Sequence, residues 1–242
     1  MNIKNQQYFS SHMLTNIRNS YQPAVKEYDL TVFIDVFRAS TTLLQIFRAG
    51  ATEVIGVNDK ALITKYVESG YRLISEVFKG GIDNSPSLIA DENLNNVKVI
   101  QKTGNLTSAI FGNLNFRRAV IGCFNNIDML AKYIKKEKFI CVDIVAASHF
   151  DEKIEAIEDL SCAIMLENLL KNIMIKEYPF NDSIRKKIET RRNGLYKFPV
   201  HYWKDIEIAL ERNSIRLIPE VTKINNSEVK FDIINSSFAL EK

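Results

Sequence analysis

The sequence predicts an α/β fold in which a mostly parallel or mixed β-sheet is flanked by helices. The first observation is an alternation of short apolar runs with longer amphipathic stretches over residues 30–74. The second is the run LTVFI at residues 30–34, whose β-branched and aromatic content is typical of a strand covered on both faces. The third is the repetition of this unit further along the chain, because alternating strands and helices produce crossovers and a largely parallel sheet.

Each expected element is an apolar run or an amphipathic stretch bounded by polar or turn-forming residues. Strands are predicted at residues 30–34, 53–57, 71–74, 97–101, 119–124 and 139–145, with late strands at 216–221 and 229–234. Helices are predicted at residues 43–50, 60–70, from 107 or 108 onward, 127–136 and 157–171. Residues 1–28 show no clear periodicity, and the charged residues 172–205 are interpreted as a helical or loop excursion.

A single domain spanning residues 1–242 is expected, with a C-terminal elaboration from about residue 172. The chain is long enough for a hydrophobic core, and 46% hydrophobic with 25% charged residues is an ordinary globular composition. The net charge of +3 comes without the concentrated basic stripe that a nucleic-acid partner requires. No apolar run approaches the roughly 20 residues that span a bilayer, so no membrane partner is expected.

The cysteines and the N-terminal residues predict a cytoplasmic location. Three cysteines without a CxxC spacing argue against both a disulfide framework and a structural zinc site. The first residues are polar and lack the apolar segment of a secretory signal. A homodimer is expected only because it is the commonest oligomer of soluble proteins.

The loop after residues 30–34 is the richest in chemistry, and ligands of open α/β sheets bind at the carboxyl ends of strands. Asp35 can be a metal ligand, an acid–base group or a nucleophile, and Arg38 can bind phosphate through two parallel hydrogen bonds. Ser40, Thr41 and Thr42 fall at a helix start, which favours an anion. A structural alternative is equally open, in which Asp35 pairs with Arg38 and Ser40 caps the helix.

Three further loops at predicted strand ends supply candidate substrate-binding residues. They are Asn84 and Ser85, then Thr103, Gly104, Asn105 and Thr107, and finally Asn125. Gly104 permits close approach of the backbone to an oxyanion, although residues 103–107 also fit a plain turn with a helix cap. Their spacing is not that of a P-loop.

Two carboxylates, Glu158 and Asp159, open the helix predicted at residues 157–171. They complement the helix dipole, and beside an anion site they equally suit a hard cation such as Mg²⁺. The candidate metal ligands are therefore Asp35, Glu158 and Asp159. Three histidines lack metal-ligand spacing and are interpreted as structural or surface residues: His12, His149 and His201.

The segment VFIDVFRASTT at residues 32–42 closely resembles the signature of the 2-phosphosulfolactate phosphatase family. That family is also called the ComB family, after its place in coenzyme M biosynthesis. Further segments that resemble family elements follow in the same order, at residues 49–55, 84–86, 122–126, 157–163 and 205–219. The resemblance therefore covers roughly residues 30–220.

This resemblance implies an α/β fold and a Mg²⁺-dependent phosphatase that acts on a small anionic phosphorylated substrate. In the family the substrate is 2-phospho-3-sulfolactate, which yields sulfolactate and phosphate. The resemblance also implies catalytic roles for Asp35, Arg38 and Glu76, with Mg²⁺ and Arg38 neutralising the phosphoryl oxygens. Whether Asp35 is a nucleophile or a metal ligand stays open at this point.

Three segments depart from the family pattern, and in one of them, residues 146–149, the Asp-Gly pair that precedes the Glu-Asp helix is not visible. A Gly-Glu-Arg-Gly-Gly-like loop appears as residues 73–81, where Glu76 is kept, the arginine is lost and Lys79 is a candidate replacement for its charge. A Thr-Asn-Gly-Thr loop appears as residues 103–107, reordered and one residue longer. A second hypothesis is therefore a retuned or catalytically silent relative that binds a small anionic metabolite.

Overall fold

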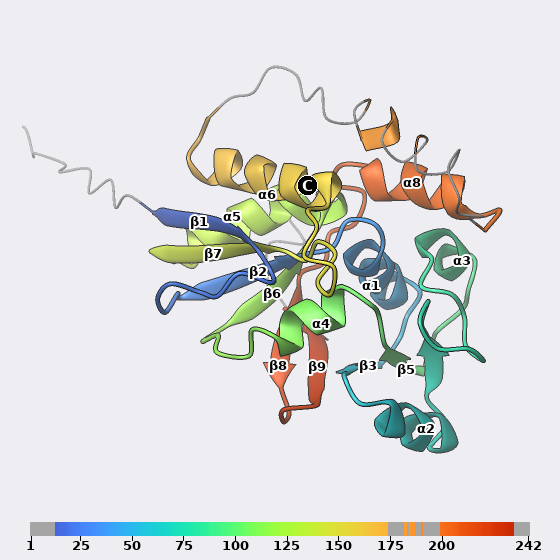
Figure 1. Ribbon diagram of the computed structural model, residues 1–242. Helices are drawn as coiled ribbons and strands as arrows, with labels where there is room; N and C mark the ends of the chain where they lie inside the picture. The colour runs from blue at the N-terminus through green and yellow to red at the C-terminus, as the bar shows by residue number, and fades with distance from the viewer. Residues whose placement is uncertain (1–12, 174–181, 183, 187–189, 191–198, 235–242) are drawn as a thin grey trace, which may run out of the picture.

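The computed structural model describes residues 13–173, 182, 184–186, 190 and 199–234, which form a nine-stranded sheet with helices on both faces (Figure 1). The predicted α/β fold is confirmed. The strands are β1 (Leu14–Asn19), β2 (Leu30–Ile34), β3 (Glu53–Val57), β4 (Arg72–Ile74), β5 (Lys98–Gln101), β6 (Ala119–Gly122), β7 (Cys141–Ala146), β8 (Pro219–Lys223) and β9 (Glu228–Ile233). The α-helices are α1 (Ala39–Arg48), α2 (Lys60–Glu68), α3 (Pro86–Ala90), α4 (Leu106–Phe111), α5 (Ile127–Lys136), α6 (Ile157–Leu170) and α8 (Tyr202–Leu210).

The sheet consists of two parallel groups joined by an antiparallel hairpin, in the order β1-β7-β2-β6-β8-β9-β3-β5-β4. β1, β7, β2 and β6 form one parallel group, and β3, β5 and β4 form the other. The hairpin β8–β9 pairs antiparallel with β6 on one side and with β3 on the other. The chain therefore passes from β2 through α1 to β3 without placing these strands side by side, which differs from the simple crossover that the strand–helix rhythm predicts.

The hairpin lies at the centre of the sheet and is not a peripheral elaboration. Val229 and Phe231 of β9 are fully buried or nearly so, and Phe231 pairs with Val54 of β3 and with Val221 of β8. Both late strands were predicted, although the first begins later than expected, at Pro219. Most of residues 174–198, which the predicted elaboration also includes, lie outside the described residues.

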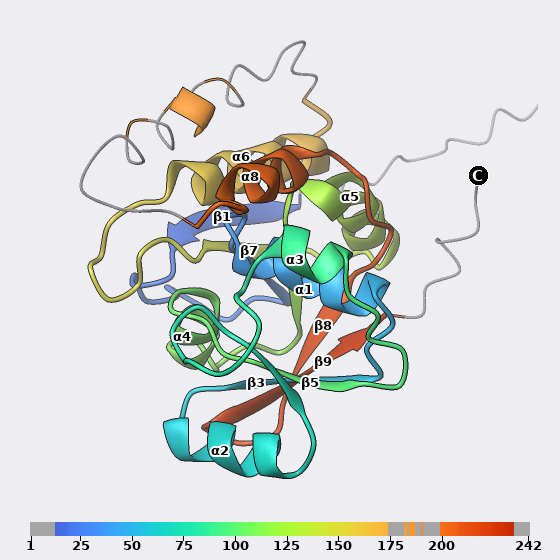
Figure 2. The same ribbon diagram turned by 90° about the vertical axis from the view of Figure 1, so that its right-hand side faces the viewer.

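Two layers of helices enclose the sheet, and α1 is buried between their cores. Helices α5, α6 and α8 lie on one side of the sheet and α4 lies on the other (Figures 1 and 2). Val32 of β2 packs in the core formed with α5, α6 and α8, whereas its neighbour Phe33 packs in the core formed with α4. Leu44 of α1 belongs to the first core and Leu43 to the second. The start of α1 is therefore held firmly beside the carboxyl end of β2. Within the described ranges, no helix has both the length and the apolar character needed to cross a bilayer.

Strand β1 was not predicted from the sequence, because many of its side chains are polar. It pairs in parallel with β7, and its polar residues contact that strand directly. Asn16 donates to Oδ1 of Asp143 at 2.9 Å, and Arg18 forms an ion pair with Oδ2 of the same carboxylate at 2.7 Å. Polar residues that satisfy each other inside a fold read as solvent-exposed residues in the sequence.

Replacing Phe231 by alanine tests the central position of the hairpin. The change removes a buried ring at the junction of the two strand groups, so we expect the free energy of unfolding to fall by about 3–5 kcal/mol. Urea unfolding followed by circular dichroism measures this change. The matched control is Thr222→Ala on the exposed side of β8, where a change within about 0.5 kcal/mol is expected. A similar small loss in both variants would contradict the central placement.

Candidate active site

Asp35 lies where the first turns of two helices meet. It follows β2 directly and is only 3% exposed. Its Oδ1 accepts a hydrogen bond from the backbone N–H of Ala39 in α1 at 3.1 Å, and the N–H of Leu106, the first residue of α4, also bonds the carboxylate. Because the first N–H groups of a helix have no partner within that helix, they are available to bind an anion.

The three hydroxyl residues that follow Asp35 brace its loop from inside. Ser40 Oγ accepts from the N–H of Asp35 at 2.9 Å, and Thr41 Oγ1 donates to the carbonyl of Val36 at 2.8 Å. Ser40, Thr41 and Thr42 are all fully buried, and Thr42 Oγ1 has no hydrogen-bond partner in the described part of the chain. The hydroxyls of Ser40 and Thr41 are thus engaged by the backbone of the loop, whereas the sequence suggested that they bind substrate.

Three carboxyl groups influence one another at this point. Burial, as the main cause, raises the pKa of Asp35 from 3.8 to about 7, and the negative charges of Glu76 and Glu158 add to the rise. The N–H groups of Ala39 and Leu106 act in the opposite direction by stabilising the ionised form. Asp35 therefore lies within the electrostatic influence of Glu76 and Glu158, and a proton or a cation is favoured beside its carboxylate.

Asp159 joins two loops at the bottom of this cluster. Its Oδ1 accepts from the N–H of Val36 at 2.8 Å, and its Oδ2 accepts from the N–H of Ser148 at 2.9 Å. Burial, followed by the charges of Asp35 and Glu158, raises the pKa of Asp159 well above its ordinary value. Both of its oxygens accept backbone N–H groups, so Asp159 holds the loops after β2 and β7 together, and its expected role as a metal ligand stays a prediction.

These side chains fit a hard cation only if the cation takes few ligands from the protein. Within the described residues, no group of three or more His, Cys, Asp or Glu side chains is arranged to hold a metal ion. Mg²⁺ needs fewer protein ligands than this, because it keeps several waters and is held by one or two carboxylates together with phosphate oxygens. Asp35 and the half-buried Glu158 fit that smaller set.

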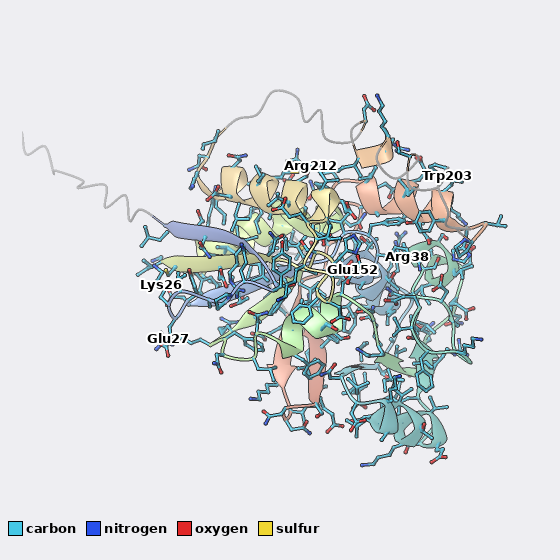
Figure 3. The ribbon with its side chains drawn as sticks, in the orientation of Figure 1. Lys26, Glu27, Arg38, Glu152, Trp203 and Arg212 are labelled. Atoms are coloured by element: carbon cyan, nitrogen blue, oxygen red, sulfur yellow. The ribbon has the colours of Figure 1, made fainter. Side chains whose placement is uncertain are left out.

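Arg38 lies between α1 and α8 and pairs with two carboxylates from distant parts of the chain (Figure 3). Its Nη1 is 2.9 Å from Oδ2 of Asp83 and 2.9 Å from Oδ2 of Asp205, and its Nη2 donates to Oδ1 of Asp83 at 3.2 Å. The structural alternative, in which Arg38 pairs with Asp35, is therefore wrong. The two residues still belong to one site, because the charge of Arg38 acts on Glu76 and that of Glu76 acts on Asp35.

The loop between β5 and α4 contributes a cation and holds Glu76. Glu76 is an exposed residue, but its Oε1 accepts from the N–H of Gly104 at 2.6 Å, and desolvation of the carboxyl group raises its pKa. Lys102 Nζ donates to the carbonyl of Thr103 and to Oγ1 of Thr107, both at 3.0 Å. Burial lowers the pKa of Lys102, and the charge of Glu76 opposes this effect. Thr103 and Thr107 are fully buried and also bond each other, so their hydroxyls serve the loop itself.

Asn84 and Ser85 hold the start of α3 in place. Asn84 Oδ1 accepts from Nε2 of Gln101 at 3.2 Å, which joins this loop to the end of β5. Ser85 Oγ donates to Oδ1 of Asp205 at 2.6 Å and accepts from the N–H of Leu88. Both residues lie near Arg38, yet their side chains are already engaged by protein partners.

The side-chain amide of Asn125 bonds to the C-terminal end of α8 and its surroundings, and not to the carboxylate cluster. Its Nδ2 donates to the carbonyls of Ile208 at 2.7 Å and Glu211 at 2.9 Å, so it secures the C-terminal end of α8. A substrate-binding role for Asn125 does not agree with these contacts. Asn105 is the residue before α4 and makes no side-chain capping bond.

Four residues that contact or adjoin the site residues were not predicted as catalytic, binding or metal-ligating residues: Asp83, Lys102, His201 and Asp205. A buried guanidinium requires an anionic partner, so an arginine that directly follows a buried strand is a signal to look for acids in the neighbouring loops, and Asp83 directly precedes residues 84–86. The pairing of Arg38 with Asp205 joins positions 167 residues apart and has no local signal. His201, interpreted as structural or surface, has its Nε2 2.9 Å from Oδ2 of Asp83.

These features define an α/β protein whose strand ends carry several carboxylates, an arginine and a lysine. The family model described as 2-phosphosulpholactate phosphatase matches residues 16–223, and the chain belongs to that family. A probable 2-phosphosulfolactate phosphatase of Bacillus subtilis is 32% identical over 151 residues, which cover 59% of this chain and 64% of that protein. The matched region therefore spans less than two thirds of the length of the Bacillus relative.

Two further relatives match over most of their length. A probable 2-phosphosulfolactate phosphatase of Caldicellulosiruptor saccharolyticus is 28% identical over 219 residues, covering 78% of this chain and 87% of the relative. One of Thermoplasma acidophilum is 26% identical over 203 residues, covering 79% and 86%. These modest identities agree with a divergent member of the family.

Replacing Asp35 by asparagine tests how much the burial of its ionised carboxylate destabilises the metal-free protein. The unfolded chain ionises Asp35 near pH 3.8, but the folded chain keeps the proton up to about pH 7, so the folded state binds more protons in between and loses stability as the pH rises. Asparagine copies the neutral form. We expect D35N to raise the free energy of unfolding by up to about 4 kcal/mol at about pH 8, and by clearly less at about pH 5.

Urea unfolding in EDTA at the two pH values measures this difference. The control is Glu68→Gln on the exposed surface of α2, which we expect to leave the pH dependence unchanged. A D35N variant that is less stable than wild type at both pH values would show that the Asp35 carboxylate is ionised and well paired in the folded protein.

Proposed function

We propose that this protein is a Mg²⁺-dependent phosphatase of a small anionic phosphoester of the 2-phosphosulfolactate type, releasing sulfolactate and phosphate. The observation that carries the proposal is the buried Asp35 carboxylate, held by N–H groups of α1 and α4 beside Glu76 and Glu158. Family membership and three relatives named as probable 2-phosphosulfolactate phosphatases support the class of reaction.

The proposed chemistry places charge-neutralising groups around the phosphoryl group. Bound Mg²⁺, held by Asp35 and Glu158, would neutralise charge on the phosphoryl oxygens. Arg38 binds further phosphoryl oxygens and orients the phosphorus toward Asp35. In the metal-free protein the Asp35 carboxyl group has a pKa of about 7, so near neutral pH it can release its proton and hold the cation as a carboxylate.

Lys102 is the group that we assign to the second acidic function of the substrate. Its ammonium has three donors, and Thr103 and Thr107 occupy two of them. It is half-buried on the loop that also carries Leu106 to Asp35, whereas Lys79 is exposed. A carboxylate or sulfonate beside the phosphoester therefore finds a fixed cation at Lys102, in place of the arginine that the family pattern carries elsewhere.

Phosphate release from a panel of phosphorylated hydroxy-acids tests the proposed activity. With Mg²⁺ we expect turnover of a substrate that carries a second acidic group, and EDTA should abolish it. D35N should lower kcat by about 10²–10⁴-fold, since it removes a group at the reacting centre. The control E68Q should retain full activity. Thermal stabilisation by these compounds without turnover under any metal would favour the silent-binder hypothesis instead.

Lys102→Met tests the assignment of the second acidic group. The side chain keeps its length but loses its charge, so we expect KM for a phosphorylated carboxylate or sulfonate to rise about tenfold with little change in kcat. A phosphoester without a second acid should be affected much less. Lys79→Met is the comparison, and a larger KM effect there than at Lys102 would contradict the assignment.

A further inference from the structure

Arg38 has two carboxylate partners, and the first of them is completely enclosed. The Asp205 side chain is 0% exposed. Its Oδ2 lies 2.9 Å from Nη1 of Arg38, and its Oδ1 accepts from Ser85 Oγ and Ser87 Oγ, both at 2.6 Å, and from the N–H of Ser87 at 3.0 Å. Asp205 therefore has four donors around one carboxylate and no route to water.

The second partner, Asp83, is held much more loosely. Its side chain is 25% exposed, and apart from Arg38 its contact is His201 Nε2 at 2.9 Å. Asp83 engages Nη1 and Nη2 of Arg38 with its two oxygens, at 2.9 and 3.2 Å. This parallel geometry is the one in which an arginine binds phosphate.

The other neighbours of the Arg38 guanidinium do not compete for the same hydrogen bonds. The Tyr202 ring lies 5.7 Å from the guanidinium carbon, and Glu76 acts on Arg38 through charge alone. Asp83 is thus a negatively charged group in the position where an anionic ligand would bind.

We propose that Asp83 is an exchangeable counter-ion of Arg38, which occupies the arginine in the ligand-free protein and yields it to an anionic group of the substrate, while Asp205 stays bound and positions the guanidinium. This rests on the proposed function, since it requires an anionic ligand to meet Arg38. Asp83 and Asp205 are both within reach of one cation, but only one of them is free to leave.

The difference in burial decides which partner can be exchanged. A partly exposed ion pair contributes little to stability, and water can solvate Asp83 when it moves away. His201 remains as a second partner for it. An isolated charge at Asp205 would be enclosed without water, so breaking that pair is strongly unfavourable. Although burial acts in the opposite direction, Arg38 and His201 lower the pKa of Asp83, so it is ionised at neutral pH and competes with an anion.

Calorimetric titration of the full chain with inorganic phosphate at low ionic strength tests the proposal. We expect Asp83→Asn to bind phosphate at least about tenfold tighter than wild type, because the competing charge is gone, and Asp205→Asn to bind it at least about tenfold weaker, because the guanidinium loses its anchor. The matched control is Asp91→Asn, which breaks an exposed ion pair to Lys204 between the same two helices, α3 and α8, and should change nothing. In turnover assays D83N should lower KM, and D205N should lower kcat.

The proposal is tested by the direction in which phosphate affinity changes in D83N and in D205N. If the ligand uses other N–H groups of Arg38 and Asp83 is a second anchor, both variants weaken binding; if only net charge matters, both tighten it. Either result overturns the proposal, as does an absence of phosphate binding in both wild type and D83N. Circular dichroism shows whether D205N folds. If D205N does not fold, Ser87→Ala replaces it, because Ser87 donates to Asp205 and its loss should weaken phosphate binding about twofold. D83N and S87A then test the proposal together.

The same titration separates this proposal from the proposed function. Opposite shifts in D83N and D205N without turnover of any phosphoester would support the counter-ion and contradict the phosphatase. Turnover with shifts of equal sign would do the reverse.

Discussion

The burial of the Asp35 carboxylate is the constraint on which the rest of the site depends. An ionised group in a protein interior needs donors, and here they come from the starts of α1 and α4. Those starts are held because α1 is enclosed on both sides and because Asp159 joins the loops after β2 and β7. Two neighbouring buried carboxyl groups with raised pKa values are costly for stability, and such costs are kept mainly where function needs them.

Two buried ion pairs in this fold illustrate different uses of the same interaction. Arg18 and Asp143, with side chains 7% and 1% exposed, bond each other and nearby polar groups at the β1–β7 edge, and this enclosed pair serves the sheet. Arg38 combines an enclosed partner with a partly exposed one and lies beside the carboxylate cluster. The two arginines are similarly buried and differ mainly in the asymmetry of their carboxylate partners.

Local sequence signals predicted most of the elements and singled out the loop around which the candidate site is described. The run at residues 30–34, the helix at 157–171 and the loop containing Asp35 and Arg38 were recognised because their periodicity and residue types are local. The place of β9 between β8 and β3, and the bond from Arg38 to Asp205, were not, because both depend on pairing over long separations in sequence. Several residues that were predicted to contact substrate, such as Ser40 and Asn125, have polar side chains that bond to the protein's own backbone. Residue type and position in the sequence do not distinguish a side chain that bonds to the backbone from one that binds a ligand.

The place of the β8–β9 hairpin has a consequence for how the chain reaches its folded state. Its strands follow all the others in sequence but separate the two parallel groups, so β6 and β3 each present an unpaired edge until residues 219–233 have been synthesised and inserted. Unpaired edges invite association with other chains, and contacts between distant residues form slowly. Completion of the native sheet is therefore a late step in the synthesis of the chain, and the unpaired edges make the incomplete chain prone to aggregation.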